Sequence, residues 1–165
     1  MIFCVDGYVN KQLLNTNKQL KMSTYYIKFA ENKKDFEATK AKCIADNSIG
    51  INFSVFRNLM TDGIREYANR VWDEREVVEN KKCSPLSRMC RWRQFALIQE
   101  MNPGDRVYLM KGFKILGEAT IVGPYLYDPR REANWLPHRR KFENLVMYDE
   151  PRQAPKQWRQ TIIKA

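Results

Sequence analysis

The chain of 165 residues has the length of one domain, and its 29 lysine and arginine residues outnumber its 19 aspartate and glutamate residues to give a net charge of +10. A single histidine and four cysteines without a Cys-x-x-Cys pair exclude histidine-based catalytic triads and zinc sites of the usual spacing. No apolar run approaches the roughly 20 residues that span a bilayer, and an apolar content of 44% excludes a disordered chain.

The N-terminal part of the chain predicts an extension, a strand and a helix. It lacks the basic start and apolar stretch of a secretory signal, so we expect a cytoplasmic protein with reduced cysteines. Strand-like sequence begins after Met22, and residues 1–21 are interpreted as an extension outside the fold. Tyr25–Phe29 alternates and is rich in aromatic residues, which predicts a strand. Asn32 suits the cap of a helix from Lys33 to Asp46.

The middle of the chain predicts a short strand and two more helices. Residues 47–53 indicate a loop that enters a strand, in which Gly50 allows close backbone approach. Thr61-Asp62 opens a second helix with apolar residues at helical spacing. Ser84-Pro85 has the order of cap and proline that begins a third helix, which ends at Met101.

The C-terminal part predicts mainly strands. Arg106–Lys111 and Lys114–Ile121 form a hairpin, and Gly123-Pro124 is expected to turn the chain. Arg139–Tyr148 predicts a further strand, and Lys156–Ile163 a short terminal helix. This pattern indicates an α+β fold with a small curved sheet or barrel flanked by three to four helices.

Five short motifs follow one another in the second half of the chain. They are Trp92-x-x-Phe95, Asn102-Pro103-Gly104-Asp105-Arg106-Val107, Ile115-x-Gly117-x-Ala119, Gly123-Pro124-Tyr125-x-Tyr127-Asp128 and His138-Arg139-Arg140-Lys141. In this order they resemble the EVE domain of the PUA-like superfamily, which is similar in fold to YTH domains. The resemblance implies a PUA-like domain over residues 22–150, with residues 151–165 as a helix packed on it.

The resemblance also implies an aromatic pocket that accepts a flipped, modified base. Phe53 follows the short strand where the family carries a tryptophan, although an ordinary core position is the alternative. A second family tryptophan aligns with Asn144, so another ring is expected to take its place. Asn52 and Ser54 either bond to a base edge or cap the next helix. The residues predicted to form the pocket are Asn52, Phe53, Ser54, Tyr127, Trp135, Phe142 and Asn144.

Basic residues flank these aromatic residues. Arginine forks match phosphate geometry, and a basic chain attracts polyanions, whereas a solvated surface is the alternative interpretation. The predicted phosphate-binding residues are Arg88, Arg91, Arg130, Arg131, His138, Arg139, Arg140 and Lys141.

We therefore expect a non-catalytic domain that reads a modified or flipped base in DNA for a defence or restriction system. No cofactor is expected, and a nuclease or ATPase in another chain, or in a larger parent protein, would supply any catalysis. The first alternative is a PUA-like module that binds structured or modified RNA. The second is a barrel that binds a small molecule or a protein.

Overall fold

The computed structural model describes residues 22–29, 36–51, 84–128, 136–156 and 160–165, together with Asn69, Asp73 and Lys82. For residues 85–92 it describes the backbone alone. None of the described helices has the length and apolar character needed to cross a membrane.

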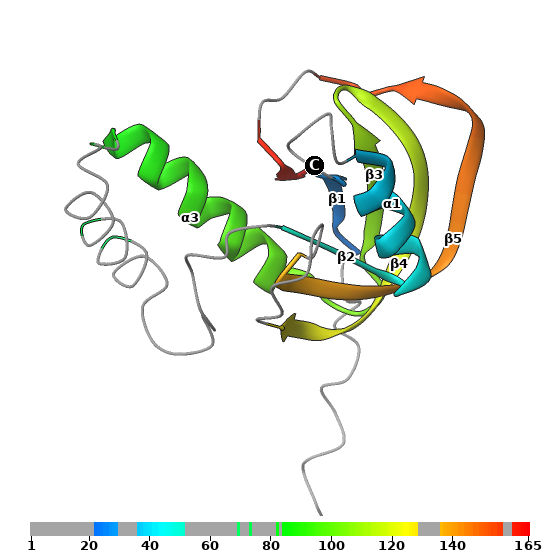
Figure 1. Cartoon of the computed structure of the whole chain (residues 1–165), viewed down its shortest axis with the longest axis horizontal. Helices are drawn as coiled ribbons and strands as arrows, with labels where there is room; N and C mark the ends of the chain where they lie inside the picture. Colours follow the sequence, from blue (N-terminus) through cyan, green and yellow to red (C-terminus); the bar gives the residue numbers. More distant parts are fainter. Residues whose placement is uncertain are drawn as a thin grey trace, which may run out of the picture.

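A six-stranded mixed sheet that curls into a half-barrel forms the body of the protein (Figure 1). The strand order is β2-β5-β4-β3-β1-β6, with β1 parallel to β3 and every other neighbouring pair antiparallel. The strands are β1 (Thr24–Lys28), β2 (Ser48–Ile51), β3 (Arg106–Lys111), β4 (Lys114–Tyr127), β5 (His138–Gln153) and β6 (Ile162–Lys164). The helices are α1 (Phe36–Ala45) and α3 (Pro85–Glu100).

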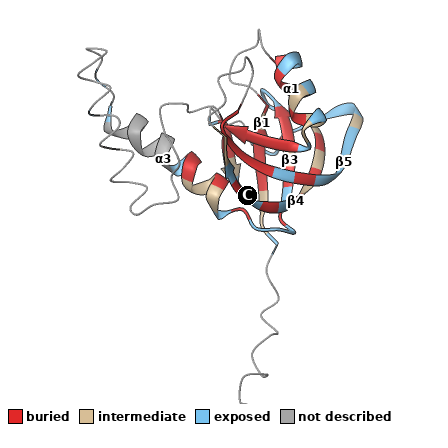
Figure 2. Cartoon of the chain, turned by 60° about the horizontal axis from the view of Figure 1, so that its bottom comes forward, coloured by how far each residue is buried: buried red, intermediate tan, exposed pale blue. Residues whose placement is uncertain are grey.

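The core lies inside the curl of the sheet, where the C-terminal half of α3 packs against it (Figure 2). Alternation along the strands explains this arrangement, because successive side chains of a strand point to opposite faces. Val107 and Leu109 of β3 and Ile121 of β4 are fully buried on the inner face. On the other face, Tyr26 and Tyr108 stack with ring centroids 5.0 Å apart in a second, smaller cluster.

The predicted elements agree with the structure along most of its described part. The strand at Tyr25–Phe29, the short strand that contains Gly50, the hairpin and the third helix are confirmed. The described residues hold two helices rather than the three to four predicted, and the helix predicted from Thr61 lies outside them apart from Asn69 and Asp73.

Two predictions about the C-terminal part differ from the structure. Gly123-Pro124 does not turn the chain, because β4 continues to Tyr127 through a bulge in which residues 122–124 lie opposite a single residue of β5. A bulge tolerates proline, which has no N–H to donate to the ladder. At the end of the predicted terminal helix, the β-branched pair Ile162 and Ile163 lies instead in β6, which joins β1 as an edge strand, and residues 157–159 of that helix lie outside the described residues.

Candidate nucleic-acid interface

Three strands meet at one corner of the sheet, which we call the β2–β4–β5 corner. β2 ends at Ile51, β4 ends at Tyr127 and β5 begins at His138. Ile51 pairs with His138, and His138 pairs with Tyr127, so the three residues form one row across neighbouring strands. Neighbouring strands lie about 4.8 Å apart, so the row spans about 10 Å.

The segments that carry most of the predicted base pocket are attached to this corner. Asn52, Phe53 and Ser54 follow Ile51 directly in the sequence, and Trp135 precedes His138 by three positions. These four residues lie outside the described part of the chain. Tyr127, the fifth predicted residue, is half-buried in the row itself.

A cluster of rings lies behind the corner. His138 is fully buried, and its Nδ1 is hydrogen-bonded to the Tyr125 hydroxyl at 2.6 Å. Its ring contacts Phe95 of α3 edge-on, with centroids 4.9 Å apart, and lies 5.2 Å from the ring of Tyr127. Gly50 makes this packing possible, because a Cβ at that position would overlap the carbonyl oxygen of His138. The side chain of His138, predicted to bind phosphate, therefore supports the corner from inside.

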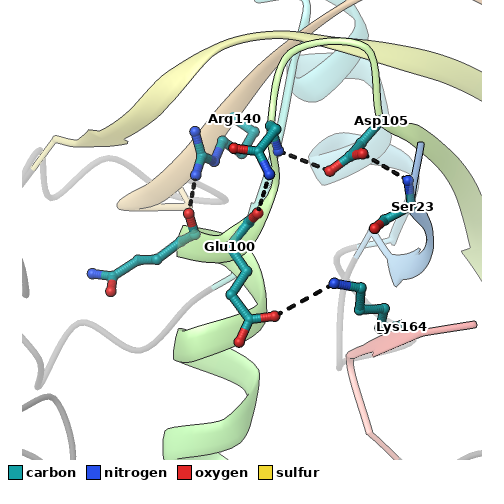
Figure 3. Close-up of polar contacts among 7 residues, drawn as sticks. Ser23, Glu100, Asp105, Arg140 and Lys164 are labelled. Carbon is teal, nitrogen blue, oxygen red and sulfur yellow. Dashed lines mark hydrogen bonds and ion pairs between the residues drawn. The ribbon is translucent and has the colours of Figure 1, made fainter. Parts of the chain in front are cut away.

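Arg140 is also buried, and its guanidinium donates hydrogen bonds to backbone carbonyl groups, one of which is drawn in Figure 3. Its Nε donates to the carbonyl oxygen of Ile98 at 2.7 Å, and its guanidinium also donates to those of Gln99 and, at 3.0 Å, Gly123. Ile98 and Gln99 lie in the last turn of α3, whose carbonyl groups have no partner within the helix. Burial lowers the pKa of Arg140, whereas nearby tyrosine and aspartate groups raise it. This arginine joins α3 to β4 and β5.

Arg139 and Lys141 point to the opposite side of β5. The buried guanidinium of Arg139 donates to the hydroxyl of Ser48 and lies 3.4 Å from the Asp46 carboxylate. Lys141 is exposed, and its Nζ donates to the Asp46 carbonyl oxygen at 2.6 Å. Of the basic run at the start of β5, only Lys141 is accessible to a ligand in this conformation.

Asp105 holds the turn between α3 and β3, which belongs to the motif that begins at Asn102. Its buried carboxylate accepts hydrogen bonds from the backbone N–H groups of Ser23 and Asn102, each at 2.8 Å (Figure 3). It thereby ties the end of α3 to the start of β1, and an ion pair of 3.7 Å between Glu100 and Lys164 joins α3 to β6 beside it. Gly104, with φ of 94°, occupies the left-handed region that the turn requires.

Phe142 and Asn144 lie away from the corner. Phe142 pairs with Ile121 and is 2% exposed in the core. Asn144 is exposed six residues along β5 from His138, a contour of about 20 Å. Its φ is 53°, and it lies at a bulge where the register shifts between Glu118 and Thr120. Asparagine tolerates this backbone conformation better than tryptophan, so the backbone at this position favours the residue that the chain carries.

The remaining predicted phosphate-binding residues cannot be placed by their side chains. Arg88 and Arg91 lie on the part of α3 described by backbone alone, and Arg130 and Arg131 lie outside the described residues. The prediction of phosphate binding at these four positions stays a prediction.

Sequence analysis missed the hydrogen bond between Tyr125 and His138. Both residues occur in the quoted motifs, but ten or more residues separate them, and their pairing depends on the register of β4 and β5. The alternation of Tyr125 and Tyr127 was the available signal, because it places both rings on the face that His138 also occupies.

The described residues offer no cluster of three or more His, Cys, Asp and Glu side chains suited to a metal ion. Cys43 is buried on α1, and burial raises the pKa of its thiol to about 12. A thiol protonated at neutral pH is a poor nucleophile.

Comparison with known proteins shows the family of the chain. No curated protein matches the chain. A family model described as "Domain of unknown function (DUF8426)" matches residues 25–154, from β1 to the end of β5. Because the match covers most of the 165 residues, the chain belongs to the DUF8426 family.

Proposed function

We propose that this protein is a non-catalytic nucleic-acid-binding domain of the EVE-like type, which reads a modified or flipped base in DNA at the β2–β4–β5 corner. The observation that carries the proposal is the row formed by Ile51, His138 and Tyr127. It attaches the segments bearing Phe53 and Trp135 to neighbouring strand ends.

The chemistry of base recognition fits this corner. A base taken out of the stack loses a few kcal/mol of stacking and pairing energy, and contact with an aromatic face offsets this loss. One ring contributes roughly 1–3 kcal/mol per stacked base. Tyr127 is held by the buried ring cluster of His138, Tyr125 and Phe95, so it loses little conformational entropy when a base stacks on it.

Positive charge supports the choice of a polyanion. The net charge is +10, and Lys141 is exposed at the start of β5, three residues from His138. In this proposal Lys141 contacts phosphate together with Arg88, Arg91, Arg130 and Arg131. His138, Arg139 and Arg140 hold the corner in shape.

The proposal extends to the biological setting. The domain acts as a specificity module in a defence or restriction system, with a nuclease or ATPase supplied by another chain or by a larger parent protein. We place it in the cytoplasm, where the free thiol of Cys43 stays reduced.

A binding panel tests the proposal. Wild-type protein is titrated with DNA duplexes and single strands that carry unmodified cytosine, methylated or hydroxymethylated cytosine, or methylated adenine. We expect one modified base to bind more tightly than its unmodified counterpart. Phe53→Ala and Tyr127→Leu should each remove that preference while the salt-dependent background binding remains.

Tyr148→Leu is the matched control, because Tyr148 is a half-buried tyrosine of the second cluster on β5. It should leave the preference unchanged. Equal loss of preference and background binding in Tyr127→Leu would count against the base-reading role. Tighter binding of RNA than of DNA in direct competition would favour the RNA-binding alternative, since contacts to the 2′-hydroxyl distinguish the two.

A further inference from the structure

The end of β4 opposite the β2–β4–β5 corner also gathers positive charge. β3 and β4 are joined there by Gly112 and Phe113, and Figure 1 shows β4 curving from this hairpin to the other end of the sheet. Gly112 has φ of 60°, as a tight hairpin turn requires at its first central position. Phe113 is 37% exposed at the tip, between Lys111 and Lys114, which pair directly across the hairpin.

Three further cations come to this tip, from β1, from β5 and from the segment that follows β5. The Nζ of Lys28 on β1 lies 5.5 Å from the ring centroid of Phe113. Arg152 of β5 pairs with Ile115, the second residue of β4 after the hairpin. The N–H of Ala154 donates to the Phe113 carbonyl oxygen at 3.0 Å, and the exposed Lys156 follows two residues later. We call this the hairpin-tip surface, formed by Lys28, Lys111, Phe113, Lys114, Arg152 and Lys156.

Few carboxylates form ion pairs with these cations within the described part of the chain. Glu37 of α1 forms an ion pair of 3.2 Å with Lys111, and its pKa is lowered, mainly by the hydrogen bond from that lysine. Lys114 and Lys156 form no ion pair with a described carboxylate. Like charges directly opposite on a sheet are destabilising, and Lys111 and Lys114 are placed in that way. The stability of the fold therefore does not explain why position 114 carries a lysine.

We propose that the hairpin-tip surface binds the phosphate backbone of a nucleic acid, as a second contact separate from the β2–β4–β5 corner. Cations arranged on adjoining strands suit a ligand with regularly repeated charges, and release of condensed counterions drives such binding. A bilayer fits less well, because Phe113 exposes little more than a third of its surface and Lys28 lies over its ring. The identity of the ligand as nucleic acid rests on the proposed function, whereas the place of contact does not.

Salt dependence of binding measures this contact. The double variant Lys114→Gln/Lys156→Gln is compared with wild type on an unmodified DNA duplex from about 50 to about 200 mM KCl. Loss of two phosphate contacts should reduce the slope of log K against log salt by about 1.8 and weaken binding roughly sixtyfold at 0.1 M salt. The matched control, Arg106→Gln/Lys164→Gln, removes two exposed charges that lie beside the start of β1, at the opposite end from Lys28 and Lys111, and should keep the wild-type slope.

The outcomes separate this proposal from the base-reading one. An unchanged slope in Lys114→Gln/Lys156→Gln, with the protein folded by circular dichroism, overturns the hairpin-tip contact alone. A reduced slope without preference for any modified base supports the contact while the base-reading proposal fails. Loss of binding to phosphatidylserine vesicles with unchanged DNA binding would identify a membrane contact instead and overturn the inference. Wild-type protein that binds no oligonucleotide at low salt refutes both proposals.

Discussion

Arg140 provides a sharp test of whether the basic run on β5 serves the fold or the ligand. We expect Arg140→Met to destabilise the protein strongly, because it removes the donor to the carbonyl groups of Ile98, Gln99 and Gly123. Methionine keeps an unbranched side chain of similar length and leaves the cavity largely filled. The loss would therefore come from hydrogen bonds and charge rather than from packing.

The magnitude follows from the burial of Arg140. Each buried carbonyl group left without a donor costs about 1–3 kcal/mol, which gives roughly 3–9 kcal/mol for three. Two of these groups belong to the last turn of α3, where a positive charge also interacts favourably with the helix dipole. The desolvation of the guanidinium, which no longer has to be buried, offsets part of this loss. We therefore expect a net decrease of about 3–5 kcal/mol in the free energy of unfolding.

Urea unfolding followed by circular dichroism measures this decrease. Lys141→Met is the matched control, since Lys141 is the exposed neighbour and should change stability by less than about 1 kcal/mol. Arg140→Met protein that remains folded should bind DNA with the wild-type salt slope if the arginine contacts no phosphate. A destabilisation no larger than that of Lys141→Met, or a slope reduced by about one, would refute the structural role.

Two further changes test the packing around β2 and α1. Gly50→Ala should destabilise the protein by roughly 1–3 kcal/mol in urea unfolding, because its Cβ would overlap the backbone of His138. The control is Gly123→Ala, which should be nearly neutral because a Cβ at that position would meet only the Lys141 side chain. Similar losses of stability in both variants would contradict this account. Cys43 makes stability depend on alkaline pH, because the folded state keeps its thiol protonated up to a pKa of about 12 while the unfolded thiol titrates from 9.0. The folded state then binds more protons, so the stabilising contribution is complete below the unfolded pKa and lost as pH rises toward the folded pKa. Between about pH 8 and pH 10 wild type should lose about 1.4 kcal/mol more unfolding free energy than Cys43→Ala, and equal losses would show that burial does not hold the proton.

Local sequence signals predicted the parts of the fold that depend on neighbouring residues. The hairpin of β3 and β4 follows from two alternating runs separated by Gly112 and Phe113. The start of α3 follows from the order of serine and proline at residues 84 and 85. β6 was not predictable in this way, because three residues become a strand only through pairing with the edge of β1.

In the candidate site, too, features that depend on neighbouring residues could be predicted, whereas those that depend on long-range pairing could not. Tyr127 could be proposed from its alternation with Tyr125, but its pairing with His138 depends on the register between β4 and β5. The register of that pair shifts at three places, and none of the three has an unambiguous sequence signal. A run of arginines likewise gives no indication of which guanidinium groups are buried. Arg139 is held by a hydroxyl group 91 residues earlier in the chain, and Arg140 by carbonyl groups 17 to 42 residues earlier.

The motifs that resemble the EVE domain serve mainly structural roles in the described residues. Asp105 ties α3 to β1, and Arg140 satisfies the last turn of α3. Gly117 leaves no room for a Cβ beside the backbone of Val146. Such residues identify an arrangement of elements rather than a ligand. The evidence for a ligand has to come from residues that keep exposed surface, such as the half-buried Tyr127 at the corner and Lys114 and Lys156 at the hairpin tip.

These two sets of residues lie at opposite ends of β4, which limits how one nucleic acid can contact both. β4 has 14 residues, so its ends are separated by at most about 43 Å along the strand. Duplex DNA carries one charge per about 1.7 Å of its axis, and 43 Å corresponds to about 13 base pairs. A duplex of this length is therefore long enough to contact both ends of the curved strand, whereas a much shorter duplex contacts one end at a time. We therefore expect the corner and the tip to contribute separately, with base preference depending on Tyr127 and the dependence on duplex length and salt depending on the hairpin tip.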